Sequence, residues 1–155
     1  MTEYEKIEKL IEIASTGKTV RILGIGNSMR PLLHGGRDYI YFQKDTHYQK
    51  GDIVLYFSQG KYIMHRIAQV TNFGYIMLGD GNQFKEEPIP QTDIYLKAVG
   101  FLRNNKYISA KHPLYRLYSS LWTNFWHLRP VIRRCKSILN RIVAPFNHGC
   151  RGEDK

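Results

Sequence analysis

Cysteine is scarce in this chain of 155 residues, which contains only two, Cys135 and Cys150, both near the C-terminus. Two cysteines are too few for a disulfide framework, and neither has the cysteine and histidine spacing of a zinc site. The sequence therefore predicts no metal site and no cofactor.

Long apolar stretches are also missing. The longest uncharged stretch of the C-terminal part runs from Leu117 to Leu128, well short of the roughly 20 residues that a membrane-spanning helix needs. Residues 1–15 carry charges throughout, unlike the apolar region of a signal peptide or a transit peptide. We therefore expect a cytoplasmic protein without a transmembrane helix.

Acidic residues are nearly absent from the C-terminal part. The chain holds 23 Lys and Arg against 13 Asp and Glu, a net charge of +10. Residues 1–100 hold 12 basic and 11 acidic residues, net +1, and residues 101–155 hold 11 and 2, net +9. Inferences about partners from charge therefore concern the C-terminal part alone.

The overall composition is that of a globular protein, with 43% hydrophobic and 23% charged residues.

Apolar residues at helical spacing predict an amphipathic helix over residues 2–15. Seven β-rich runs bounded by turn residues follow, and no helical pattern alternates with them, so a mainly β, mixed or antiparallel fold is expected. The predicted strands are Thr19–Ile25, Asp38–Phe42, Asp52–Phe57, Lys61–Val70, Gly74–Leu78, Ile94–Arg103 and Lys106–Ser109.

Helical spacing of apolar residues returns at Pro113 and continues to Leu128, and a second helix is expected from Pro130 to about Ile142. The predicted organisation is thus a short N-terminal helix (1–18), a β domain (19–110) and a basic, aromatic helical tail (111–155).

A turn after the first predicted strand is the first candidate for chemistry. It contains Gly24, Gly26, Ser28 and Pro31. Because glycines let the backbone turn sharply, a serine here can present its hydroxyl beside backbone N–H groups, as a nucleophile with an oxyanion hole requires. The alternative is a serine that only caps the next segment.

Two further features follow along the chain. His65 lies among apolar residues of a predicted strand, where a single histidine is most often structural. Asp80 lies in Gly-Asp-Gly-Asn (79–82), which also has the composition of an ordinary hairpin turn.

The order of four short motifs along the chain is similar to that in a known protein family. Ser-Met-x-Pro (28–31), Gly-Asp-Ile-Val (51–54), His-Arg-Ile (65–67) and Gly-Asp-x-Asn (79–82) occur in sequence. This set resembles the signal-peptidase-like serine peptidases, which include the self-cleaving LexA-type repressor domains, and it covers about residues 21–100. The resemblance implies a LexA-like mixed β fold.

The resemblance also implies roles for single residues. Ser28 would be the nucleophile, and His65 would be its base. A histidine at this position is similar to the endoplasmic-reticulum type of signal peptidase, whereas bacterial signal peptidases have a lysine there. A histidine suits this role because it is nearly poised to exchange a proton at neutral pH. Asp80 is the first candidate for the acid that orients His65, and Glu86 the second. The oxyanion hole would use the N–H groups of Ser28 and of Gly26 or Asn27.

The functional prediction is a serine endopeptidase that cleaves leader or signal-like peptides. The alternative, from another class, is an inactive module whose basic tail binds peptide, membrane or nucleic acid. This alternative leaves the order of the motifs unexplained, and nucleic acid is not the expected partner. The family's signal peptidases carry a transmembrane helix before the serine, whereas the helix expected here is short and charged.

We expect residues 113–144 to replace that anchor. Two helices with an aromatic-rich apolar side and basic residues would attach the protein to an anionic membrane surface, peripherally on the inner face. The alternative is that these aromatic residues pack on the sheet.

Overall fold

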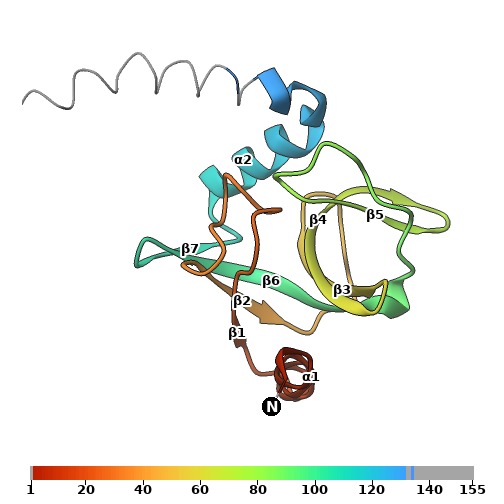
Figure 1. Cartoon of the computed structure of the whole chain (residues 1–155), viewed down its shortest axis with the longest axis vertical. Helices are drawn as coiled ribbons and strands as arrows, with labels where there is room; N and C mark the ends of the chain where they lie inside the picture. The colour runs from red at the N-terminus through yellow and green to blue at the C-terminus, as the bar shows by residue number, and fades with distance from the viewer. Residues whose placement is uncertain (1, 132–133, 135–155) are drawn as a thin grey trace, which may run out of the picture. The chain divides into compact units, whose positions relative to one another are not determined.

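The computed structural model describes residues 2–131 and residue 134 (Figure 1). The chain divides into two units, residues 1–124 and residues 125–155. The described part of the second unit includes a short 3₁₀ helix, η2 (Trp126–Leu128). The first unit begins with helix α1 (Glu3–Ser15). Thr2 and Glu5 form a capping box at its start, which satisfies two backbone N–H groups that the helix leaves unpaired.

A seven-stranded antiparallel sheet forms the body of the first unit. The strand order is β1-β2-β6-β3-β4-β5, and β7 pairs with β6. The prediction of a mainly β fold with a short N-terminal helix and C-terminal helices is confirmed, and every predicted strand boundary lies within two residues of the observed one. The strands are β1 (Val20–Leu23), β2 (Tyr39–Gln43), β3 (Ile53–Ser58), β4 (Lys61–Thr71), β5 (Gly74–Leu78), β6 (Ile94–Arg103) and β7 (Lys106–Ser109).

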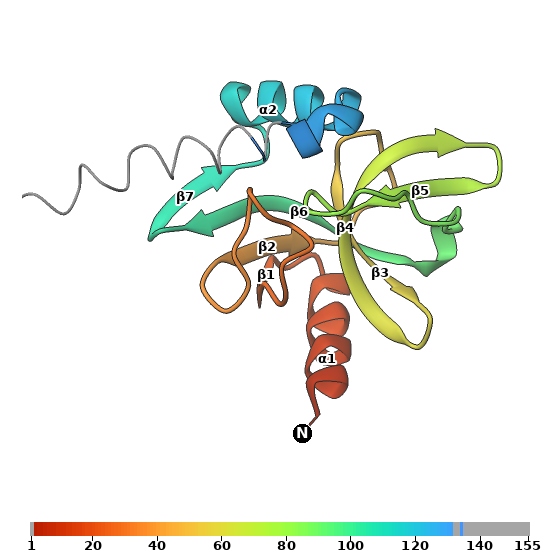
Figure 2. The same ribbon diagram turned by 45° about the horizontal axis from the view of Figure 1, so that its top comes forward.

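Strand β3 is buried on both faces and divides two apolar clusters. Ile53 and Leu55 point into one cluster, which also receives the apolar side of α1. Val54 and Tyr56 point into the other. Irregular pairing in three of the strand pairs bends the sheet, so that the strands curve around these clusters (Figure 2).

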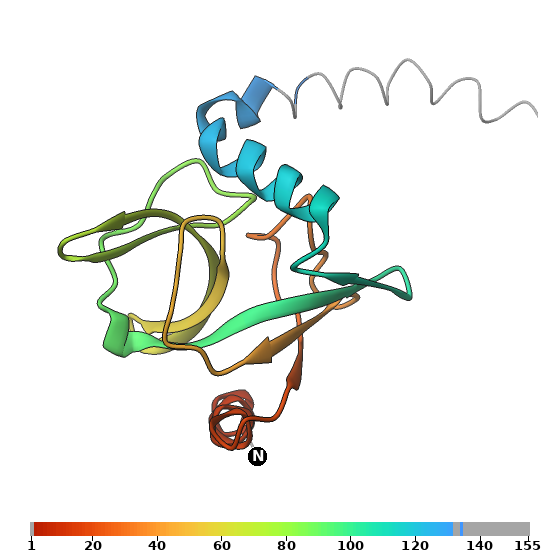
Figure 3. The same ribbon diagram turned by 180° about the vertical axis from the view of Figure 1, so that it is seen from behind.

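Helix α2 (Pro113–Asn124) packs on the sheet domain on the side away from α1 (Figure 3). Tyr115 and Ser119 are buried there. Leu114, Leu117 and Leu121 lie on the outer side of the helix and are 71%, 56% and 51% exposed. The aromatic side of α2 therefore packs on the β domain, and an aliphatic side faces outward.

The helix predicted after Pro130 falls almost wholly outside the described residues. Within the part of the chain that the structure describes, no helix combines the length and the apolar character needed to cross a bilayer.

Candidate active site

The imidazole of His65 lies against the carboxylate of Glu86, whose side chain is 29% exposed. The imidazole lies on β4 and is 5% exposed, and its Nδ1 is 2.6 Å from Oε1 of Glu86. Glu86 reaches this position because the loop after β5 folds back, and its N–H donates to the carbonyl of Met77 on β5. Sequence reasoning named both residues, and the structure brings them into contact.

Tyr56 completes this group. Its hydroxyl donates to Oε2 of Glu86 and lies 3.0 Å from Nδ1 of His65. Although burial alone would raise the pKa of Glu86, the hydrogen bonds from His65 and Tyr56 outweigh it and lower the pKa. Burial and the neighbouring carboxylate raise the pKa of Tyr56 far above its ordinary value. At neutral pH, Glu86 is therefore a carboxylate and Tyr56 a neutral donor.

This arrangement determines which nitrogen of His65 can act as a base. Because Nδ1 faces the carboxylate of Glu86 at 2.6 Å, the proton of the neutral imidazole belongs on Nδ1. The lone pair is then left on Nε2. A histidine held in this way by a carboxylate is the arrangement that serine hydrolases use for general base catalysis.

Asp80, the first candidate for the acid, has another partner. Its carboxylate accepts two hydrogen bonds from Arg66, Nε to Oδ1 at 2.8 Å and Nη2 to Oδ2 at 2.7 Å. Both side chains are buried, at 1% and 0% exposure. The expectation that Asp80 orients His65 is therefore corrected: Glu86 contacts the imidazole, because the buried guanidinium of Arg66 requires a carboxylate of its own.

The Arg66–Asp80 pair also holds α2 on the sheet. Arg66 donates to Oγ of Ser119 at 2.6 Å and to the carbonyl of Gly51 at 2.9 Å. Trp122 donates from its indole N–H to the carbonyl of Asp80 at 3.2 Å. Part of the Gly-Asp-Gly-Asn motif thus has a structural role.

The turn after β1, which carries Ser28, packs against the loop that follows β5. The carbonyl of Ser28 accepts a hydrogen bond from the N–H of Gly81 at 2.6 Å. A Cβ on Gly79 would lie 2.6 Å from the same carbonyl oxygen, closer than real Cβ atoms approach, so glycine is required there. Leu78, the last residue of β5, pairs with Arg66 on β4. The loop that begins at Gly79 therefore starts beside His65, and it contacts the turn that carries Ser28.

The side chains of Ser28 and His65 are both described, and no hydrogen bond joins them. Contacts between a nucleophile and its base are often long without substrate. That the two residues face each other across a cleft stays a prediction.

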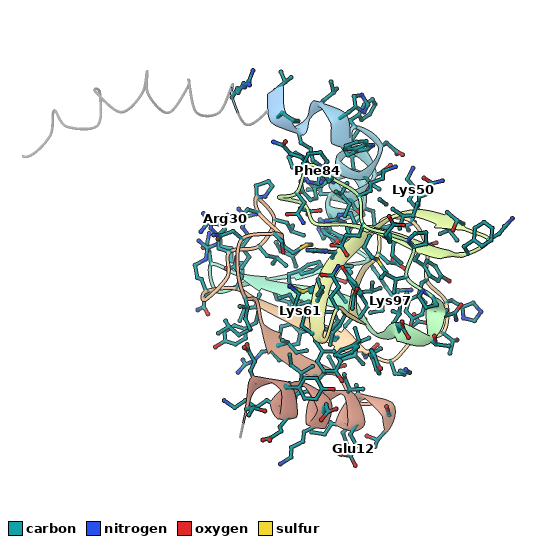
Figure 4. All side chains as sticks on the ribbon, turned by 45° about the vertical axis from the view of Figure 1, so that its right-hand side comes forward. Glu12, Arg30, Lys50, Lys61, Phe84 and Lys97 are labelled. Atoms are coloured by element: carbon teal, nitrogen blue, oxygen red, sulfur yellow. The ribbon has the colours of Figure 1, made fainter. Side chains whose placement is uncertain are left out.

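Ser28 lines a groove of about 600 Å³. One wall is formed by β1 and the turn after it, and the other by the first half of β4, where Lys61 is labelled in Figure 4. The start of α1 closes one side. The lining includes Ile22, Leu23, Ile25, Phe42, Leu55, Tyr62, Ile63 and Met64. The groove is therefore mostly apolar, with the candidate nucleophile on its wall.

The wall formed by β1 has open backbone groups. Gly24 donates its N–H to Asp38 and accepts from Gly36, so its polar groups face β2 and the loop before it. Backbone groups alternate in direction along a strand. Those of Leu23 therefore point away from β2, on the side of the groove.

The opposite wall has the same property. A two-residue turn joins β3 and β4 and pairs Ser58 with Lys61, so residues 61, 63 and 65 direct their polar groups at β3. Those of Tyr62 and Met64 point away from β3, where β5 does not yet pair. Two open strand edges thus border one groove, which suits an extended peptide.

The predicted oxyanion donors lie on the same turn. Within the described residues, the N–H groups of Gly26, Asn27 and Ser28 donate no hydrogen bond to the protein. Gly26 has a φ of +72°, in the region that favours glycine. Their role as oxyanion donors stays a prediction.

Tyr56 and Arg66 are the site residues that sequence reasoning missed. The hairpin register pairs Val54 with His65 and Tyr56 with Ile63, which puts Tyr56 diagonally next to His65 on one face. The tight turn between the predicted strands could have indicated this pairing. No sequence signal indicated that Arg66 would be fully buried.

No protein-family model matches this sequence, and no curated protein matches it either. Among the described residues, no group of three or more histidine, cysteine or acidic side chains is placed to hold a metal ion.

Proposed function

We propose that this protein is a serine endopeptidase of the signal-peptidase-like type, with Ser28 as nucleophile, His65 as general base and Glu86 as the acid that orients the histidine. The observation that carries the proposal is the contact in which Nδ1 of His65 lies 2.6 Å from Oε1 of Glu86. This contact keeps the proton on Nδ1 and the lone pair of Nε2 available.

The reaction follows from these roles. Nε2 of His65 takes the proton of Ser28 as Oγ attacks the peptide carbonyl, and the oxyanion is held by the N–H of Ser28 with Gly26 or Asn27. The C–N bond breaks when the imidazolium gives its proton to the leaving amine. Water, deprotonated by the same nitrogen, then hydrolyses the acyl ester. Glu86 stays ionised throughout and stabilises the imidazolium.

The groove supports a peptide substrate. Its two open strand edges offer backbone donors and acceptors to an extended chain, and its apolar lining favours apolar side chains. A leader or signal-like peptide, extended and apolar near its cleavage site, meets both requirements.

A serine-directed acylating probe tests the proposal on the full-length protein. We expect labelling of the wild type, no labelling of Ser28→Ala, and full labelling of Ser15→Ala, which removes an exposed serine of α1. Digestion of a peptide library followed by mass spectrometry gives the cleavage sites. A Ser28→Ala protein that cleaves peptides as fast as the wild type rejects Ser28 as nucleophile.

The alternative is a module that binds peptides in the groove without cleaving them. His65 is not among the residues that line the groove, whereas Ser28 is, and this favours the alternative. It predicts peptide binding that Ser28→Ala leaves unchanged, with no acylation of the wild type.

For the location of the protein, we propose peripheral attachment to an anionic membrane surface through the segment 113–144. The aromatic residues of α2 pack inward, so Leu114, Leu117 and Leu121 supply its outer apolar side. Residues 101–124 contain four basic residues and no acidic one, which complements anionic lipid.

Liposome co-sedimentation tests this attachment. Full-length protein should bind anionic vesicles at low salt and dissociate as the salt concentration rises. Leu117→Gln/Leu121→Gln should bind more weakly. Phe73→Gln, which removes an exposed apolar side chain from the turn between β4 and β5 and leaves α2 intact, should bind as the wild type does. Equal sedimentation of all three proteins contradicts attachment through α2.

A further inference from the structure

The hydroxyl of Tyr56 is one of three polar groups that meet beside the apolar cluster that contains Val54 and Tyr56. The others are the imidazole of His65 and the carboxylate of Glu86. Tyr56 is 0% exposed, and its hydroxyl donates to Oε2 of Glu86 while Oε1 contacts Nδ1 of His65. Each oxygen of the carboxylate therefore has its own partner.

Two partners restrict a carboxylate more than one. With only His65 as partner, the carboxylate of Glu86 can rotate about its last bond and exchange its two oxygens. The hydroxyl of Tyr56 opposes this rotation, because it comes from β3 and is held within the packed cluster. It also replaces the water that would otherwise solvate a partly buried charge.

We propose that Tyr56 is a positioning residue, which fixes the Glu86 carboxylate and through it keeps the neutral imidazole of His65 protonated on Nδ1. The catalytic part of this inference rests on the proposed peptidase function, whereas the effect on the imidazole does not. The hydroxyl of Tyr56 contacts Glu86 and His65, so Tyr56 acts through these two side chains.

Tyr56→Phe removes only the hydroxyl. A matched control is Tyr48→Phe, since Tyr48 is buried in the same cluster and its hydroxyl donates to the carbonyl of Asp45 at 2.6 Å. Both variants lose a buried hydroxyl together with the hydrogen bond that it donates. Only Tyr56→Phe removes a donor from Glu86.

Nitrogen-15 NMR of the histidine rings tests the proposal without any substrate. Neutral His65 in the wild type and in Tyr48→Phe should carry its proton on Nδ1, and Tyr56→Phe should show a mixture of both tautomers. The Glu86 carboxylate should also protonate at higher pH in Tyr56→Phe. The other charged group that acts on Glu86 is Lys61, which all three proteins retain.

Peptide cleavage provides the second measurement. Tyr56→Phe should lower kcat about tenfold, equivalent to about 1.4 kcal/mol, with KM unchanged, and Tyr48→Phe should change neither. An unchanged tautomer in a folded Tyr56→Phe overturns the proposal. A changed tautomer without cleavage by any protein, including the wild type, supports the positioning contact and rejects the peptidase function.

A measurement on the wild type covers the case in which Tyr56→Phe does not fold. The hydroxyl proton of Tyr56 should exchange slowly with water and show a cross-peak to the ring of His65. A rapidly exchanging hydroxyl without this cross-peak contradicts the proposal.

Discussion

Replacing Asp80 by asparagine should destabilise the protein, because it leaves a buried guanidinium without its counter-charge. Arg66 and Asp80 are 1% and 0% exposed, so water cannot take over the role of the carboxylate. Breaking a buried ion pair by removing one partner costs about 3–5 kcal/mol. For a chain of this size, 1 kcal/mol corresponds to about 2–4 °C in Tm, so we expect Tm to fall by about 6–20 °C.

Urea and thermal unfolding, followed by circular dichroism, measure this effect. Asp93→Asn is the matched control, since Asp93 lies at the surface turn η1 (Gln91–Asp93) and its substitution should change stability by less than about 0.5 kcal/mol. The double variant Arg66→Met/Asp80→Leu should be less destabilised than the sum of its single variants, because no unpaired charge remains.

The same experiment separates the two acidic candidates. If Asp80→Asn is as stable as the wild type but loses all activity, Asp80 is the catalytic acid and its assignment to Arg66 as a structural partner is refuted. If it is destabilised and keeps activity below its Tm, the assignment is supported.

Three further predictions concern Glu86, the Ser28–His65 couple and Gly79. Glu86→Gln should keep the fold and lower kcat a hundredfold or more, as the loss of an orienting carboxylate does in serine hydrolases. The pKa of Glu86 is lower in the folded state than in the unfolded state. The ionised carboxylate should therefore stabilise the fold fully above the ordinary pKa of about 4.3, and this stabilisation should be lost as pH falls through the pKa of the folded state. Urea unfolding between pH 2 and pH 6 should show this loss in the wild type and not in Glu86→Gln. Ser28→Ala and His65→Ala should each abolish cleavage, and the double variant should be no worse than either, since the two residues act as a unit; a further large loss in the double variant argues against the couple. Gly79→Ala should lower kcat by displacing the Ser28 carbonyl, 2.6 Å from the new Cβ, whereas Gly36→Ala, which has a φ of +76° and open space around it, should alter stability alone; equal kcat values for the two variants contradict the role of Gly79.

The local elements of this fold could be read from the sequence. The helix over residues 3–15 and all seven strands follow from the spacing of apolar residues and from the turn residues between them, because both depend on neighbours in the chain. The order of the motifs also indicates Ser28 and His65, and the resemblance to the signal-peptidase-like family adds Glu86.

The choice between the two acids required the tertiary structure. Asp80 and Glu86 lie six residues apart in the sequence, and both are acidic side chains in one loop. Their roles differ because His65 and Arg66 are neighbours on a strand and point to opposite faces, so each meets a different carboxylate. This outcome depends on how the loop after β5 folds back, which no local pattern indicates.

The sequence by itself determined the helix, the strands and the residues able to do chemistry, since these depend on side-chain type and spacing. Only the tertiary structure decided that Glu86 and Tyr56 hold His65, that Asp80 neutralises Arg66, that α2 turns its aromatic side inward, and that two open strand edges border the groove beside Ser28. The physical reason is that burial, ion pairing and free strand edges arise between segments far apart in the chain, where the cost of an unpaired buried charge selects each partner.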